Sequence, residues 1–132
     1  MRDFMLDTNI CIYVMKGRLP GLSARFAEFS SQICISTITL AELHYGAEKS
    51  SRQLENLRAL EQFAARIAVL PFSASAAAHF GQIRAHLERA GTPASSTDVL
   101  IGGHARSEGL TLVTTNRREF DRMPGLLVEN WV

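Results

Sequence analysis

The sequence has only two cysteines, almost no net charge and no long apolar run. Fourteen Lys and Arg residues oppose 13 Asp and Glu residues, so the formal net charge is +1, and a polyanion could be recognised only by a local patch. Cys11 and Cys34 each lie between isoleucines, which is typical of small buried hydrophobes in a reducing compartment. No signal peptide is visible and no apolar run approaches ~18 residues, so we expect no membrane partner and a cytoplasmic location.

Several motifs that would identify an enzyme class are also missing. The chain has no Cys/His cluster at zinc spacing, no Gly-rich phosphate loop, no GxSxG elbow and no HExxH. Its four histidines are scattered, and packing or surface roles are expected of them. What the chain does have is 46% hydrophobic and 20% charged residues over 132 positions, a balance that predicts one globular domain over residues 1–132.

Apolar runs and periodic stripes alternate along the chain. Short buried runs predict strands at 4–6, 33–36, 67–72, 110–114 and 126–128. Amphipathic spacing and stop signals predict helices at 10–16, 22–29, 52–66, 73–90, 96–106 and 117–123, and another whose N-cap is Thr37 or Thr39. Strands that alternate with helices indicate an α/β fold with a parallel sheet covered on both faces.

Four acidic residues fall close to the ends of predicted strands. Asp7 ends the first strand, Glu42 lies early in the helix after the second, Asp98 begins the helix before the fourth, and Glu119 follows the fourth by five residues. Each has an ordinary interpretation as a helix cap or a capping-box acid. In an open parallel sheet, however, ligands bind at the carboxyl ends of strands where the strand order reverses. If the first and fourth strands are neighbours, the four acids converge there.

Converging carboxylates repel one another, so they must share protons or hold a cation. Oxygen-only ligands suit Mg²⁺ or Mn²⁺, and such an ion supports phosphodiester hydrolysis. Polar residues close to the acids in sequence are candidates for supporting roles, namely Thr8, Asn9, Ser36 and Asn116. Arg117 and Arg118 are candidates for contact with substrate phosphate, although a solvated helix face is an equally good interpretation of them.

Four segments together resemble the PIN domain, and most closely the VapC toxins of bacterial toxin–antitoxin operons. They are Phe4–Asn9, Ile35–Leu43, Asp98 with Ile101–Ala105, and Val113–Phe120, and the likeness continues to Glu129-Asn130-Trp131. The resemblance implies a three-layer α/β/α sandwich with a mainly parallel sheet of order 3-2-1-4-5. It also implies a homodimer and a VapB-type antitoxin, with DNA met only indirectly through that antitoxin.

The function expected from the residues and the resemblance is metal-dependent cleavage of RNA, plausibly tRNA. The resemblance assigns Asp7, Glu42, Asp98 and Glu119 to the metal site, and it differs at Asn116, where many relatives have an acid. Two alternatives remain open at this point. One is a non-catalytic RNA-binding or receiver-like module whose acids are only caps. The other is a phosphatase with Asp7 as nucleophile, which Asn9 disfavours because that chemistry usually has a second acid at this position.

Overall fold

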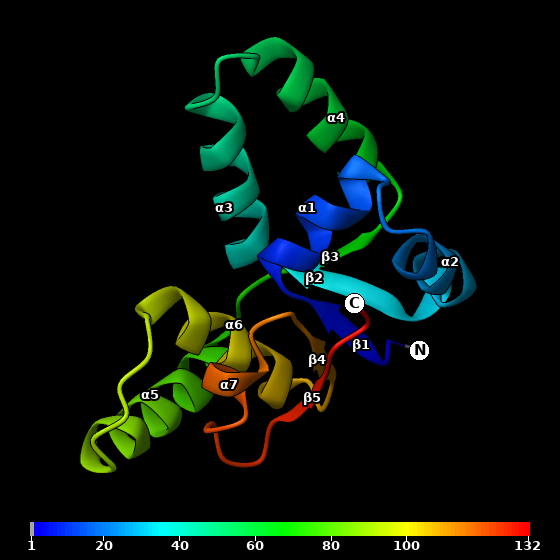
Figure 1. The fold of residues 1–132 in the computed structure, drawn as a ribbon. Coiled ribbons are helices and arrows are strands. Elements are labelled where there is room, and N and C mark those ends of the chain that lie inside the picture. The colour runs from blue at the N-terminus through cyan, green and yellow to red at the C-terminus, as the bar shows by residue number, and fades with distance from the viewer. Residues whose placement is uncertain (1) are drawn as a thin grey trace.

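The computed structural model describes residues 2–132 and contains a five-stranded sheet covered by helices on both faces (Figure 1). The strand order is β3-β2-β1-β4-β5, and every neighbouring pair is parallel. Both the α/β class and the order 3-2-1-4-5 are therefore confirmed. The strands are β1 (Phe4–Leu6), β2 (Ile33–Ser36), β3 (Ala68–Leu70), β4 (Thr111–Val113) and β5 (Leu127–Glu129).

The helices follow the predicted order, with ends that differ by a few residues. They are α1 (Thr8–Lys16), α2 (Pro20–Glu28), α3 (Thr37–Glu48), α4 (Gln53–Ala65), α5 (Ala74–Arg89), α6 (Ser96–Ser107) and α7 (Arg117–Phe120), with a 3₁₀ turn, η1 (Ser30–Gln32), before β2. Within residues 2–132, none of these helices combines the length and the apolar character needed to cross a membrane.

The predicted N-cap of α3 is wrong, because the cap is Ser36 and neither Thr37 nor Thr39. Ser36 has extended backbone angles at the end of β2, and its Oγ accepts a hydrogen bond from the Ile38 amide at 3.0 Å. The helix therefore begins directly after the strand. Glu42 then lies in the second turn of α3, where a capping role is excluded because capping acids occupy the first turn.

Side chains along β1, β2, β3 and β4 alternate between two hydrophobic cores. Leu6 of β1 packs beneath α1, α2, α3 and α4, whereas Met5 packs on the opposite face with α5, α6 and α7. Figure 1 shows these two helical layers on either side of the sheet. Cys11 and Cys34 are free and buried in different cores, as expected of small apolar residues.

The strand order reverses beside β1, and this reversal sets the position of the site. The chain runs from β1 outward through β2 to β3 and then returns to β4 on the other side of β1. Leu6 pairs with Val113, and the Asp7 amide donates to the Val113 carbonyl at 2.9 Å. The carboxyl ends of β1 and β4 therefore lie side by side, as the convergence of the four acids requires.

Candidate active site

Asp7 lies at the centre of the site and is 5% exposed. It is the N-cap of α1, where its Oδ1 accepts from the Thr8 amide at 2.8 Å. Its Oδ2 accepts from the Thr114 hydroxyl at 2.7 Å. Burial raises the pKa of Asp7 and the charge of Glu42 adds to that rise, whereas the hydrogen bonds from Thr114 and Thr8 oppose it. Asp7 is thus both a cap and a buried, oriented carboxylate.

Glu42 reaches this centre from α3. Its Oε1 accepts a hydrogen bond from the Thr8 hydroxyl, which joins the first turn of α1 to the second turn of α3. Since the charge of Glu42 contributes to the raised pKa of Asp7, the two carboxylates lie within electrostatic reach of each other. Thr8 therefore connects the two acids, because its amide bonds one and its hydroxyl bonds the other.

Asp98 and Glu119 form a second pair of carboxyls beside Asp7. Burial is the largest cause that raises the pKa of Asp98 to about 7, followed by a hydrogen bond shared with Glu119 and the charges of Asp7 and Glu119. Ser95 caps α6 by accepting from the Asp98 amide at 3.2 Å, so Asp98 also occupies a capping-box position. With its pKa at about 7, the Asp98 carboxyl is disfavoured as an anion in this position when no cation is bound.

The donor chemistry of this site fits a hard divalent cation. All four acids offer oxygen, and their mutual repulsion is relieved by positive charge. Across residues 2–132, no three His, Cys, Asp or Glu side chains are already gathered as a ready-made metal site. In the metal-free chain, Glu42 accepts a hydrogen bond from Thr8, and Asp98 shares one with Glu119.

The other candidate residues from the sequence differ in whether hydrogen bonds link them to the four acids. Asn9 is exposed on α1, and Ser36 forms a hydrogen bond with His104. In residues 2–132, neither side chain has a hydrogen bond to one of the four acids. The backbone N–H of Asn116 donates to Thr114 Oγ1. This bond links the start of α7 to the hydroxyl that holds Asp7. Arg117 and Arg118 are exposed on α7, where Arg117 pairs with Asp121 at 3.3 Å.

Thr114 was missed by the sequence reasoning. It is fully buried directly after β4, donates to Asp7 and accepts from the Asn116 amide. The available signal was a β-branched hydroxyl at the carboxyl end of a buried strand, which needs a polar partner. Identifying Asp7 as that partner requires knowledge that β1 and β4 are neighbours.

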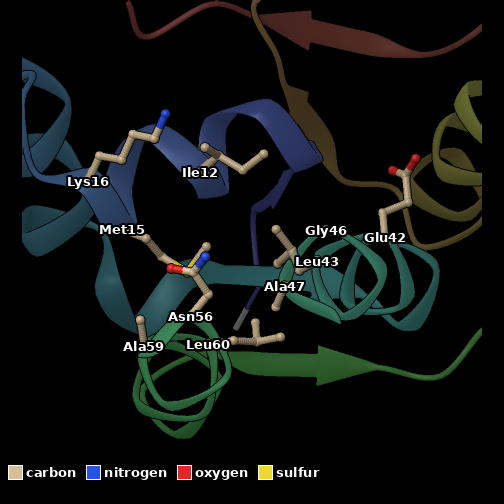
Figure 2. Close-up of a pocket in the computed structure, with 10 residues that line it drawn as sticks. All are labelled: Ile12, Met15, Lys16, Glu42, Leu43, Gly46, Ala47, Asn56, Ala59 and Leu60. Atoms are coloured by element: carbon tan, nitrogen blue, oxygen red, sulfur yellow. The ribbon is translucent and has the colours of Figure 1, made fainter. Parts of the chain in front are cut away.

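A groove of about 310 Å³ opens next to Glu42, between α1, α3 and α4. Figure 2 shows that its walls are mainly apolar, with Met15 from α1 opposite Leu43 and Ala47 from α3 and Leu60 from α4. Glu42 lines one end of it and Lys16 another part of its rim. Any segment that fills this groove therefore lies directly beside a carboxylate of the site.

Comparisons with family models, curated proteins and solved structures agree on one family. A family model described as "PIN domain" matches residues 4–126. A Shigella flexneri protein named "tRNA(fMet)-specific endonuclease VapC" is 51% identical over 131 residues, or 99% of each chain. "Ribonuclease VapC2" of Haemophilus influenzae is 47% identical over 132 residues, with both chains fully covered. Among solved structures, the DNA-bound VapBC complex from Salmonella typhimurium contains a chain with a TM-score of 0.96, 50% identity and full coverage of both chains.

Proposed function

Since the chain belongs to the VapC family of PIN-domain ribonucleases, we propose that it is the toxin of a toxin–antitoxin pair and hydrolyses phosphodiester bonds in tRNA. The observation that supports the proposal is that Asp7, at the end of β1 beside β4, lies within electrostatic reach of both Glu42 and Asp98, and that Asp98 shares a hydrogen bond with Glu119. The tRNA substrate is supported by the name of the Shigella flexneri relative.

We propose that four acids bind Mg²⁺ or Mn²⁺, because both ions prefer oxygen ligands. These acids are Asp7, Glu42, Asp98 and Glu119. Such an ion, when bound, activates water and neutralises charge on the phosphate. Thr114 and Thr8 hold the Asp7 carboxylate in one orientation, because each donates to a different carboxylate oxygen. Because Asp7 is already buried and oriented, little reorganisation is needed at this carboxylate.

Other residues are assigned to substrate contact and support. Arg118 has no acidic partner within 4.0 Å in residues 2–132 and is exposed next to Glu119, so its guanidinium is available to a phosphate. Arg117 is assigned the same role, although it must exchange Asp121 for the phosphate. We retain Thr8, Asn9, Ser36 and Asn116 as supporting residues, with direct hydrogen-bond support for Thr8 and, through its amide, for Asn116.

The central experiment compares wild type with Asp7→Asn on total tRNA, with Mn²⁺ or with EDTA. Wild type is expected to produce discrete fragments only with the metal, and Asp7→Asn to produce none while its circular dichroism spectrum is unchanged. Glu88→Gln is the matched control, because Glu88 is an exposed acid that pairs with Arg84 on α5. Sequencing the fragment ends identifies the tRNA and the bond. Cleavage by Asp7→Asn at the wild-type rate would refute the site assignment.

We further propose that the groove beside Glu42 receives apolar side chains of a VapB-type antitoxin. The comparison structures are VapBC complexes, and an inhibitor seated in this groove would cover one wall of the site. Ala59→Trp should block the groove, so that the toxin still cleaves tRNA but is no longer inhibited by its cognate antitoxin. Ala77→Trp places the same bulk on exposed α5 and should leave inhibition intact. Full inhibition of Ala59→Trp would contradict this role of the groove.

The remaining assignments concern assembly and location. We propose a homodimer, supported by Tyr45 and Leu54, whose large side chains are 66% and 73% exposed on α3 and α4. Light scattering that gives the mass of one chain would contradict it. We also propose that residues 1–132 act as one PIN domain, that DNA is bound through the antitoxin, and that the toxin acts in the cytoplasm, where tRNA is found. The complex with DNA from Salmonella typhimurium supports the DNA assignment.

The strand order, the position of Glu42 and the family membership disagree with the two alternative interpretations, a non-catalytic module and a phosphatase. A receiver-like module has strand order 2-1-3-4-5, whereas this sheet has order 3-2-1-4-5. A non-catalytic role for the acids does not explain why Glu42 lies outside the capping turn or why its charge acts on Asp7. A phosphatase with Asp7 as nucleophile disagrees with membership of a ribonuclease family.

A further inference from the structure

The middle of α6 is fixed by three consecutive residues that face three different parts of the chain. A Cβ on Gly102 would come 2.5 Å from the sulfur of Met123, and one on Gly103 would come 2.9 Å from the backbone nitrogen of Phe80 in α5. His104 then reaches across to Ser36 at the end of β2. Since α6 touches backbone on one side and is bonded on another, its position relative to the sheet is closely determined.

His104 is fully buried, and its surroundings are not those of a simple packing residue. Its Nδ1 lies 2.8 Å from Ser36 Oγ, and its ring meets the ring of Phe72 edge to face with centroids 5.4 Å apart. Its Nε2 has no hydrogen-bond partner in the described part of the chain. An unpaired buried nitrogen is unfavourable for folding, so an apolar side chain of similar size would serve packing better.

The hydrogen bond between His104 and Ser36 joins the two helices that carry opposite sides of the proposed cation site. Ser36 caps α3, and Glu42 follows it by six residues on that helix. Asp98 precedes His104 by the same number of residues on α6. One buried bond therefore connects the start of the helix that presents Glu42 to the middle of the helix that presents Asp98, without touching either acid.

We propose that His104 is a positioning residue of the cation site, which acts through Ser36 to keep Glu42 and Asp98 at the separation that binding of the ion requires. The inference rests on the proposed function, since it concerns the same four acids. Asp98 is carried by α6 and Glu42 by α3. In residues 2–132, the bond between His104 and Ser36 is the only hydrogen bond between side chains that connects α6 with α3 or its cap. Without it, α3 would remain attached to α6 only by apolar packing, which tolerates small sliding movements.

The experiment measures the affinity of the purified, metal-free chain for Mn²⁺ alone by titration calorimetry, and then kcat and KM on tRNA. His104→Leu removes the bond and keeps the Ser36 cap. His104→Asn places an amide where Nδ1 was and should restore the bond. Ile101→Val is the matched control, because it trims a buried core residue on the same helix without touching Ser36. We expect His104→Leu to weaken Mn²⁺ binding at least fivefold and to lower kcat with KM within twofold of wild type. His104→Asn and Ile101→Val should stay within twofold of wild-type affinity.

A His104→Leu protein that binds Mn²⁺ within twofold of Ile101→Val would overturn the positioning role. If His104→Leu does not fold, the bond is tested from its other end with Ser36→Ala against Ser73→Ala. Both lose a serine cap, at α3 and α5 respectively, but only the first loses the contact with His104. Equal Mn²⁺ affinities of these two variants would again overturn the role. A wild-type chain that binds Mn²⁺ but cleaves no RNA would refute the proposed function alone, because the affinities still decide the role of His104. A wild-type chain that binds no Mn²⁺ would refute both.

Discussion

Replacing Asp98 by Asn should make the metal-free protein more stable at pH 8. In the wild type, burial, the bond shared with Glu119 and the charges of Asp7 and Glu119 raise the pKa of Asp98 from 3.8 to about 7. Each pKa unit corresponds to about 1.4 kcal/mol, so this shift would be about 4 kcal/mol in a fully buried site. Asp98 is only partly buried, and solvent screening reduces the gain to about 1–2 kcal/mol. In a chain of 132 residues that is a rise in Tm of roughly 3–8 °C.

The sign of the pH dependence follows from the direction of the shift. A carboxyl whose pKa is raised on folding disfavours the folded state once it must ionise there, so wild-type stability is lost as pH rises from about 4 towards 7. The advantage of Asn at position 98 is therefore complete at pH 8 and less than half as large at pH 5. Saturating Mn²⁺ should reverse the order at pH 8, because it stabilises only the chain that keeps all four acids.

Thermal denaturation in EDTA at pH 8 and pH 5 measures both effects. Glu55→Gln is the matched control, because Glu55 is an exposed acid in the first turn of α4, as Asp98 is in the first turn of α6. It should give no gain in Tm at either pH. Asp98 is not destabilised by its neighbours in the folded chain if Asp98→Asn is no more stable than wild type at pH 8, or if its gain is the same at both pH values.

Three further predictions concern single contacts. Thr114→Val leaves Asp7 Oδ2 and the backbone N–H of Asn116 without their partner. It should lower the free energy of unfolding, measured by urea denaturation, by about 1–3 kcal/mol, and Thr114→Ser should lower it less. Thr8→Val removes the bond to Glu42 and should weaken Mn²⁺ binding in calorimetry with little change in Tm; an unchanged Kd would count against it. Arg118→Ala should raise KM for tRNA at low salt and leave kcat unchanged, whereas a loss of kcat alone would exclude substrate binding as its role.

The strand and helix order could be predicted from the sequence because each element carries its own local signal. Ile33-Cys34-Ile35 is an apolar run of strand length, and the stripe through Leu57, Leu60 and Phe63 has helical spacing. Element ends were less predictable, because they depend on caps. Ser36 was assigned to the strand and its role as the cap of α3 was missed, since one residue here both ends β2 and begins the helix.

The four acids could be proposed from the sequence because they share a place, namely the ends of predicted strands. Thr114 and His104 were not singled out because their contacts are with partners far away in the sequence. Thr114 bonds a residue 107 positions earlier and His104 one 68 positions earlier. No local pattern marks such pairs, and they become visible only when the sheet order brings β4 next to β1 and α6 over β2.

The central position of β1 has a consequence for the order of assembly during synthesis. Asp7 precedes Thr114, whose hydroxyl holds its carboxylate, by 107 positions. β1 lies between β2 and β4, so its pairing on the second side waits until β4 has been made, and parallel pairing of such distant segments is slow. A chain that ends before β4 therefore lacks the contact that orients Asp7.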